Sequence, residues 1–202
     1  MGAIFSIYQS HLRDYTVQEG VVEIQQNVRA AMDILSQDIR LAGYNPSGKA
    51  TTGFVNQNFS TEPVTTGPAN IAFTADLDGD STINAAETDM AKMEQIAYRL
   101  NGTDLQRYAL LADKWQTVAE NIQAVEFLYT LSAGPPTTTP AGADLPNIRE
   151  VTITLFARST NQEQGFVALA TFPTASGALL PTLPGFRYRL LTLTIKCRNM
   201  GL

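Results

Sequence analysis

An apolar stripe along the first part of the chain limits the possible folds more than any other sequence feature. Apolar side chains recur there at spacings of three and four residues, which is the pattern of one face of an α-helix. The stripe consists of Val17, Val21, Ile24, Val28, Ala31, Leu35, Ile39 and Ala42. Gly43 follows as a C-cap, and Pro46 prevents the helix from continuing. We therefore predict one helix over residues 3–42.

The length of this helix exceeds what its own domain can cover. A helix of about 40 residues is about 60 Å long, whereas a globular body of 202 residues is only about 40–45 Å across. We therefore expect residues 17–44 to pack on the body and residues 1–16 to project from it. The apolar side chains of the projecting half then need a different partner. They are Ile4, Phe5, Ile7, Tyr8, Leu12 and Tyr15.

Beyond the helix, the pattern changes from helical periodicity to alternation. Residues 45–70 are rich in Pro, Gly, Ser, Thr and Asn and are predicted to form a loop. Residues 132–147 contain a Pro-Pro pair and are predicted to form a second loop. Asn101-Gly102 predicts a tight hairpin. Alternating apolar side chains predict strands over 71–75, 95–100, 105–110, 125–131, 151–155 and 191–197, with a weaker one over 166–172.

These segments predict an α+β fold. In it, a long N-terminal helix (residues 1–44) packs by its C-terminal half on an antiparallel β-sheet within a globular head (residues 45–202). The composition supports a packed head, because 44% of the residues are apolar and only 16% are charged.

The composition also excludes several classes of function. The net charge of −5 leaves no basic footprint for nucleic acid. The single cysteine, Cys197, rules out an internal disulfide and a cysteine zinc cluster, and we expect it to be a small buried residue. The single histidine, His11, has the sequence context of a surface residue. Because no nucleophile motif or phosphate-binding glycine loop occurs, we expect neither catalysis nor a small-molecule substrate.

Residues 76–87 match the template of a calcium-binding loop. In that template, oxygen ligands stand at alternate positions, and a final carboxylate binds through both of its oxygens. The matching residues are Asp76, Asp78, Asp80, Thr82 through its backbone carbonyl, Asn84 directly or through water, and Glu87. The loop departs from the template at Ser81, where glycine normally allows a sharp turn. We predict a structural Ca²⁺ site, and the alternative is a solvated acidic loop without an ion.

Several segments resemble one protein family. The stretch Gln25-Gln-Asn-Val-Arg-Ala-Ala-Met32 and the helix ending Asp38-Ile-Arg-Leu-Ala-Gly-Tyr44 carry the closest similarity. The hairpin around Ile96–Gly102 and the terminal segment Phe186–Asn199 agree with it. Together they resemble the type IV pilin superfamily, most closely PilW-type minor pilins and next the J-type pseudopilins of type II secretion. The resemblance covers most of the chain.

The resemblance implies a non-enzymatic filament subunit of a bacterial envelope. In this family a prepilin cleavage site and an apolar segment come first, so this chain is expected to start partway down the helix. That earlier segment would hold the subunit in the inner membrane before assembly. Afterwards the helix would pack with other minor and major pilins, or with pseudopilins, in a filament or tip at the cell surface. We assign this helix contact to Ile4, Phe5, Tyr8, Leu12 and Tyr15.

Three alternatives stay open at this point. The first is a J-type pseudopilin in a secretion pseudopilus, which the sequence barely separates from a PilW-type pilin. The second is a calcium-dependent adhesive module that binds through residues 45–90. From the residues alone, the projecting helix also fits a coiled-coil or domain-swapped dimer.

Overall fold

The long N-terminal helix is present. The computed structural model describes residues 2–59, 62–83, 94–109 and 114–201, with side chains described from residue 17 onward except at 109 and 114. The first element, α1, runs over Gly2–Leu41, which agrees with the predicted helix to within one residue at each end. It ends before Gly43, whose φ of 78° is a conformation that favours glycine. A Cβ at Gly43 would also lie 2.7 Å from the sulfur of Met200, so the position requires glycine for space as well.

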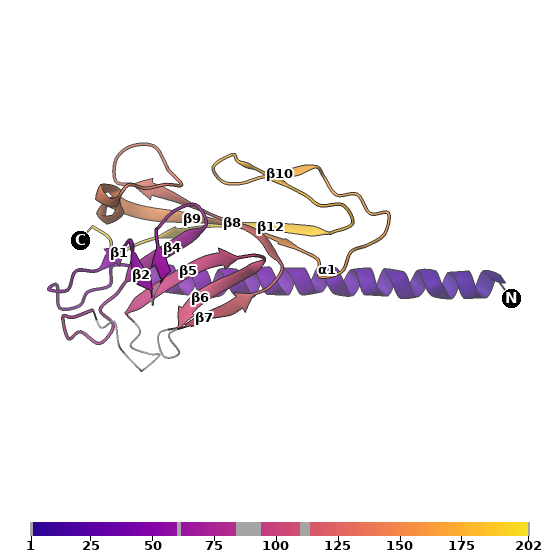
Figure 1. Cartoon of the computed structure of the whole chain (residues 1–202), viewed down its shortest axis with the longest axis horizontal. Helices are drawn as coiled ribbons and strands as arrows, with labels where there is room; N and C mark the ends of the chain where they lie inside the picture. The colour runs from indigo at the N-terminus through magenta and orange to yellow at the C-terminus, as the bar shows by residue number, and fades with distance from the viewer. Residues whose placement is uncertain (1, 60–61, 84–93, 110–113, 202) are drawn as a thin grey trace.

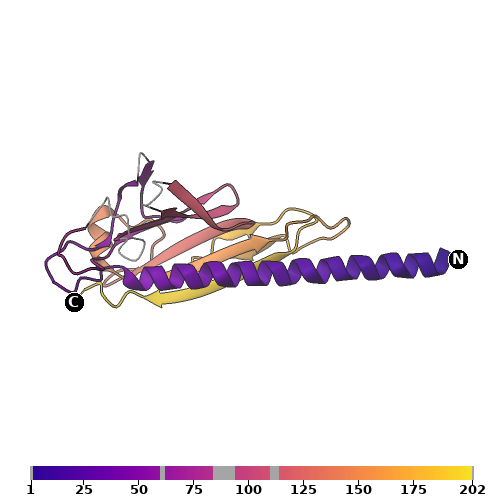
Figure 2. The ribbon, with the colours of Figure 1, turned by 90° about the horizontal axis from the view of Figure 1, so that it is seen from below.

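The buried face of α1 lies in its C-terminal half. The residues of this face are Ile24, Val28, Ala31, Met32, Leu35, Ser36 and Ile39, followed by Ala42 just beyond the helix. Val17 and Val21 are only half-buried, so contact with the head weakens toward the N-terminus. In both Figure 1 and Figure 2, α1 continues as a projecting rod past the strands of the head. The head therefore holds one half of the helix and fixes the direction of the other half.

The head contains two main antiparallel sheets rather than the single predicted sheet. The strands are β1 (Gly53–Phe54), β2 (Gln57–Phe59), β3 (Glu62–Val64), β4 (Asn70–Thr74), β5 (Gln95–Asn101), β6 (Asp104–Ala109), β7 (Lys114–Ala119), β8 (Ile122–Leu131), β9 (Ile148–Arg158), β10 (Thr171–Pro173), β11 (Leu179–Pro181) and β12 (Tyr188–Lys196). One sheet has the order β1-β4-β5-β6-β7, and the other has the order β12-β9-β8. Two small hairpins, β2-β3 and β10-β11, stand apart from them.

Both sheets pack against the helix. α1 contacts β12 and β9 of one sheet and β7 of the other. The shared core lies between these layers and includes the fully buried Leu35, Phe73, Phe127 and Ile153. The predicted hairpin is present, because Asn101 pairs with Asp104 across a tight turn between β5 and β6. The predicted α+β fold class, with a long helix packed on antiparallel strands, is confirmed.

The sequence prediction fails where strands are short. The predicted loop over residues 45–70 contains β1, β2 and β3. β2 and β3 pair with each other and have three residues each, and β1 pairs with the distant β4. Segments this short show no local periodicity. In β1, the ring of Phe54 lies 6.0 Å from that of Phe73 and 6.2 Å from that of Tyr129. β7 is not predicted either, and the weak strand predicted over 166–172 is wrong except in β10.

The region predicted as a second loop, residues 132–147, contains a short 3-10 helix, η3 (Gly142–Asn147). Pro146 lies inside it. Such a short helix tolerates proline because few of its backbone N–H groups have an internal partner. The region therefore contains no regular α-helix or central strand, as its prolines predict.

Cys197, directly after β12, is buried and has no disulfide partner. Burial raises the pKa of its thiol to about 12, and the nearby charge of Glu150 contributes to the increase. The thiol is therefore uncharged at neutral pH, and thiolate chemistry is suppressed. The interpretation of Cys197 as a small buried residue is confirmed.

A polar network ties α1 to the larger sheet. The Tyr98 hydroxyl on β5 donates a hydrogen bond to the Asp38 carboxylate at 2.5 Å. The Arg107 side chain on β6 donates to the same oxygen at 2.6 Å. Burial, followed by the charge of Asp38, raises the pKa of Tyr98 well above its usual range. Tyr98 therefore stays protonated and acts as a permanent donor.

We predict that Asp38→Ala lowers the free energy of unfolding by about 2 kcal/mol, because Tyr98 and the charged Arg107 both lose their acceptor. The measurement is urea unfolding followed by circular dichroism. Asp33→Ala is the control, because Asp33 is an exposed carboxylate on the same helix, and its loss is expected to change stability by less than about 0.5 kcal/mol. Equal effects of the two substitutions would contradict this role of the network.

Candidate metal site and assembly helix

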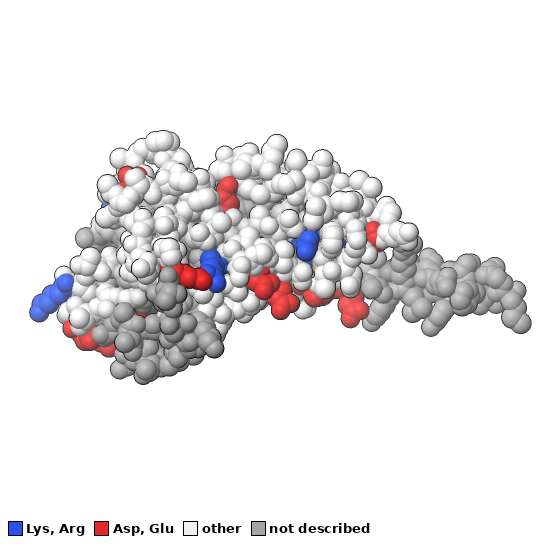
Figure 3. Space-filling model, in the orientation of Figure 1, with Lys and Arg blue, Asp and Glu red and all other residues white. Residues whose placement is uncertain are grey.

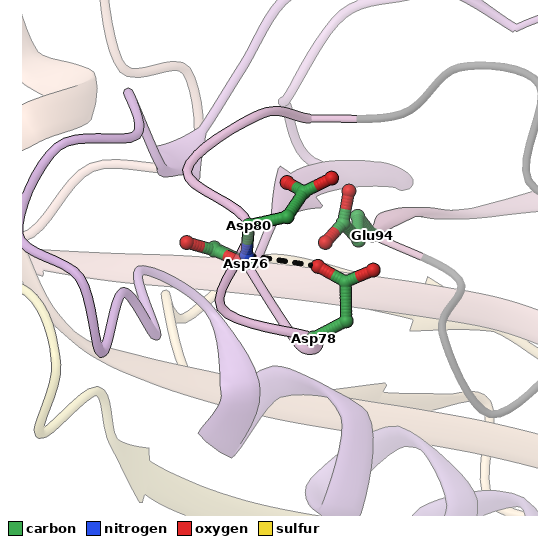
Figure 4. Close-up of side chains that lie close together, drawn as sticks. All are labelled: Asp76, Asp78, Asp80 and Glu94. Atoms are coloured by element: carbon green, nitrogen blue, oxygen red, sulfur yellow. Dashed lines mark hydrogen bonds between the residues drawn. The ribbon is translucent and has the colours of Figure 1, made fainter.

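An acidic cluster lies in the loop after β4. Asp76, Asp78 and Asp80 come from this loop, and Glu94 stands directly before β5 (Figure 4). One carboxylate oxygen from each of the four residues lies within 4.8 Å of the others. Asp76 and Glu94 are buried, whereas Asp78 and Asp80 are exposed. The cluster could bind a metal ion, because hard cations prefer carboxylate oxygens.

Asp76 is the residue that joins the cluster to the end of α1. Its backbone N–H donates to the carbonyl of Tyr44 at 2.8 Å. Its carboxylate accepts hydrogen bonds from the Ser47 hydroxyl at 3.1 Å and from the backbone N–H of Gly79 at 2.7 Å. The position of Asp76 is therefore fixed by the segment that follows the helix, not by its own loop alone.

The backbone of the loop makes the sharp turn that the calcium template requires. Ser81 has a φ of 75°, which is uncommon for a residue with a side chain. Neighbouring backbone groups point at the carboxylates, since the N–H of Asp80 donates to Asp78 at 3.1 Å and the N–H of Thr82 donates to Asp80 at 2.7 Å. The turn is therefore formed by serine at the position where the template has glycine.

The structure brings some of the predicted ligands together and adds another. Asp76, Asp78 and Asp80 lie in the cluster, and Thr82 lies beside it with an exposed side chain. Asn84 and Glu87 lie outside the described residues.

Sequence reasoning missed Glu94, because it lies beyond the end of the loop template. The register between β4 and β5 is the feature from which the position of Glu94 could have been predicted. Thr74 pairs with Gln95, and the N–H of Ala75 donates to the carbonyl of Glu94 at 2.9 Å. Glu94 therefore stands opposite the residue that precedes Asp76.

Electrostatics make the cluster unfavourable without a compensating charge. Ionised carboxylates at this spacing repel one another, and burial of Asp76 and Glu94 removes the water that would otherwise screen them. Backbone donors offset part of this repulsion, including the N–H of Leu77, which donates to Glu94 at 3.2 Å. A bound cation would relieve the rest.

The predicted assembly residues all belong to α1. Ile4, Phe5, Tyr8, Leu12 and Tyr15 stand in its first half, and their side chains lie outside the described residues. Among the described residues, no helix combines the length and the apolar character that a bilayer crossing requires.

Comparison with known proteins agrees with the geometry. The sequence profile of a family described as prepilin peptidase-dependent protein B matches residues 18–171, which is more than half of the chain. Among solved structures, a type IV-like pilin from Thermus thermophilus superposes with a TM-score of 0.55 at 13% sequence identity. The superposition covers 88% of this chain and 98% of the pilin, and at this identity it shows a common fold alone. No curated protein sequence matches the chain significantly.

We predict that saturating Ca²⁺ raises the melting temperature by about 5 °C or more, because a ligand that binds only the folded state stabilises it. Asp78→Asn together with Asp80→Asn removes two exposed carboxylates with little change in shape, and this variant is expected to lose the shift. Glu19→Gln together with Glu120→Gln, two exposed positions elsewhere, is the charge-matched control and is expected to retain it. Differential scanning calorimetry with and without the ion makes the comparison, and the absence of a shift in the unmodified chain would remove the site.

Proposed function

Because the chain belongs to the prepilin peptidase-dependent protein B family, we propose that it is a type IV pilus subunit of the PilW minor-pilin type. In this role it helps to initiate or cap the filament together with other pilins. The protein acts by binding, not by catalysis. Its place is the bacterial envelope, where the inner membrane holds the subunit before assembly.

The observation that carries this proposal is the geometry of α1. The helix contains 40 residues, and the head covers only its C-terminal half. The rod that projects beyond the strands (Figure 2) belongs to a single continuous helix, so its direction is fixed by the head. A rigid, directed helix suits parallel packing with the helices of neighbouring subunits, because each subunit then enters the bundle at the same angle.

The driving force for assembly is burial of an apolar helical face. Burial of apolar surface contributes about 25 cal/mol per Å², and the same face can lie in lipid before assembly. Ile4, Phe5, Tyr8, Leu12 and Tyr15 provide this face in the proposal. They recur at helical spacing, which places them together on one side of α1.

A J-type pseudopilin of a type II secretion pseudopilus is the second candidate. It would use the same helix and the same fold, so the distinction is one of cellular system. A strain without the gene separates the two roles. Loss of surface pili with normal secretion supports the PilW-type role, whereas loss of protein secretion with normal pili supports the pseudopilin role.

We further propose that the acidic cluster binds Ca²⁺ as a structural ion. Asp76, Asp78, Asp80 and Glu94 offer enough carboxylate oxygens for much of the coordination shell, and the remainder would come from Thr82, Asn84 and Glu87 as the template predicts. A calcium-dependent adhesive surface around this loop is a third candidate function, and the cluster is the observation that favours it. Calcium-dependent surface attachment that persists after filament assembly is abolished would support adhesion over assembly.

We predict that Phe5→Asp together with Leu12→Asp abolishes incorporation into filaments, because two charges on the packing face must be desolvated in the bundle. The measurement is immunoblotting of filaments sheared from cells that express the variant. The melting temperature of the head should stay within about 2 °C of the original, because the substitutions precede the packed half of α1.

Ser6→Asp together with Ser10→Asp is the matched control for this test. It adds the same charge to the same turns of α1, but on the opposite side of the helix. This variant should still be incorporated. Equal incorporation of both double variants would contradict assembly through the proposed face.

A further inference from the structure

A long uncharged segment joins β9 to β12. Residues 164–186 contain no Asp, Glu, Lys, Arg or His, and we name them the apolar arm. Four large apolar side chains of the arm are solvent-exposed, with exposed fractions of 84% for Val167, 70% for Leu169, 64% for Leu179 and 44% for Leu183. Figure 3 shows the surface around β10 almost free of charged side chains. An exposed apolar patch of this kind marks an interaction surface.

The arm is held firmly at the turn of its hairpin. The Glu126 carboxylate on β8 accepts hydrogen bonds from the hydroxyls of Thr174 at 2.8 Å and Ser176 at 2.7 Å, and from the N–H of Ser176 at 3.1 Å. The Phe172 ring of β10 lies 5.1 Å from the Phe156 ring of β9. Exposure of the apolar side chains is therefore not a result of a loose loop.

The open end of the arm is held at the point where α1 leaves the head. The Arg187 guanidinium pairs with the Glu163 carboxylate at 2.9 Å, and Gln164 lines the same hollow as Val17 of α1. A preorganised element loses little conformational entropy on binding. The arm is thus suited to contact a partner as a rigid body.

A hollow of about 650 Å³ lies at the opposite end of the head, where α1 terminates. Among the residues that the structure describes, none that lines it is charged. Its apolar lining includes Tyr44, Pro46, Pro146 and Met200, and the side chain of Tyr44 is 39% exposed. By contrast, the hollows along α1 are lined by Glu19, Glu23, Glu120, Glu163 and Arg187. An apolar segment that covered those charges would desolvate them at a cost, whereas the uncharged hollow imposes no such cost.

We propose that the apolar arm of one copy binds in the uncharged hollow of a second copy. The two surfaces lie at opposite ends of the helix segment that the head covers, from Val17 to Gly43, and are about 39 Å apart along it. A contact between different surfaces of identical chains closes into a ring only when its rotation permits, and otherwise it propagates as an open array. This inference rests on the proposed filament role, in which subunits point the same way, so that the arm of one copy can face the far end of another. It adds a contact between copies of this chain to the proposed contacts with other pilins.

A second copy fits the arm better than a bilayer does. Glu19 and Glu23 on α1 lie next to the open end of the arm, in the hollows that Asn161 also lines. Anionic phospholipids would repel these carboxylates, and the arm has no lysine or arginine to attract a lipid headgroup. The uncharged hollow of a second copy lacks this repulsion.

Disulfide trapping tests the contact in solution with the full chain. Val167→Cys stands on the arm and Thr51→Cys stands in the hollow, both at exposed positions, and the buried Cys197 is protected from reaction. The two variants are mixed and oxidised with copper phenanthroline. The control mixture pairs Thr51→Cys with Leu193→Cys, an exposed position on β12. The arm variant should form about tenfold more mixed dimer with Thr51→Cys than the control variant does. One chain with both Val167→Cys and Thr51→Cys should form a ladder of oligomers.

Equal trapping with the Leu193→Cys control, or preferential trapping of Val167→Cys with itself, would overturn the proposal. Binding to a bilayer would also overturn it: the chain would then pellet with vesicles of phosphatidylethanolamine and phosphatidylglycerol, and Leu169→Asp would abolish this pelleting. Leu169→Asp should instead lower mixed-dimer formation at Val167→Cys, and Thr52→Lys in the hollow should restore part of it. The two proposals can fail separately. If no mixed dimer is trapped, but Phe5→Asp with Leu12→Asp still abolishes incorporation into filaments, the arm contact is refuted and the filament role stands.

Discussion

Packing of both sheets on one stripe of α1 is the constraint on which the rest of the structure depends. Leu35 and Ile39 are fully buried between the helix and the sheets, and β12, β9 and β7 all contact the helix. Asp38 adds a directional link, because Tyr98 and Arg107 bind the same carboxylate oxygen from neighbouring strands. Apolar burial supplies most of the stability, whereas the polar link fixes rotation of the sheet about the helix. The head is thus oriented relative to the projecting rod, and every surface feature of the head has a defined position along the helix axis.

How far the sequence predicts the structure depends on the length of each pattern. The helix repeats its apolar spacing over many turns, so its bounds follow from the residues to within one position. Long strands such as β9 alternate for long enough to be recognised, but β1 and β3 contain only two and three residues. Segments this short show no period, and the position of β1 depends on the distant rings of Phe73 and Tyr129, which a local window cannot detect. The same reason explains the acidic cluster: spacing identifies Asp76, Asp78 and Asp80, whereas Glu94 depends on the register of β4 with β5.

Charge is distributed unevenly along the axis that α1 defines. Carboxylates line the hollows along the helix. The apolar arm has none, and the hollow beyond Gly43 has none among its described lining residues. A carboxylate-rich flank disfavours random side-by-side contact between copies through like-charge repulsion. The proposed contact of the arm with the hollow requires the two copies to point in the same direction. Both effects favour a filament of parallel subunits. Repulsion destabilises the wrong orientations, and apolar contact stabilises the right one.

The acidic cluster and the uncharged hollow share a structural element, so the two proposals are linked. The segment after α1 provides Tyr44 and Pro46 to the hollow, and the carbonyl of Tyr44 accepts the N–H of Asp76. Ser47 binds the Asp76 carboxylate, and Gly79 of the acidic loop approaches Pro46, so that a Cβ there would lie 3.6 Å from its ring. A cation that orders the carboxylates would therefore also order one wall of the hollow. Coupling between two sites is reciprocal, so occupation of the hollow by a second copy would raise affinity for the cation by the same factor. Under the two proposals, the loop would form part of the docking surface, and an ion would act on assembly through the segment that ends the helix.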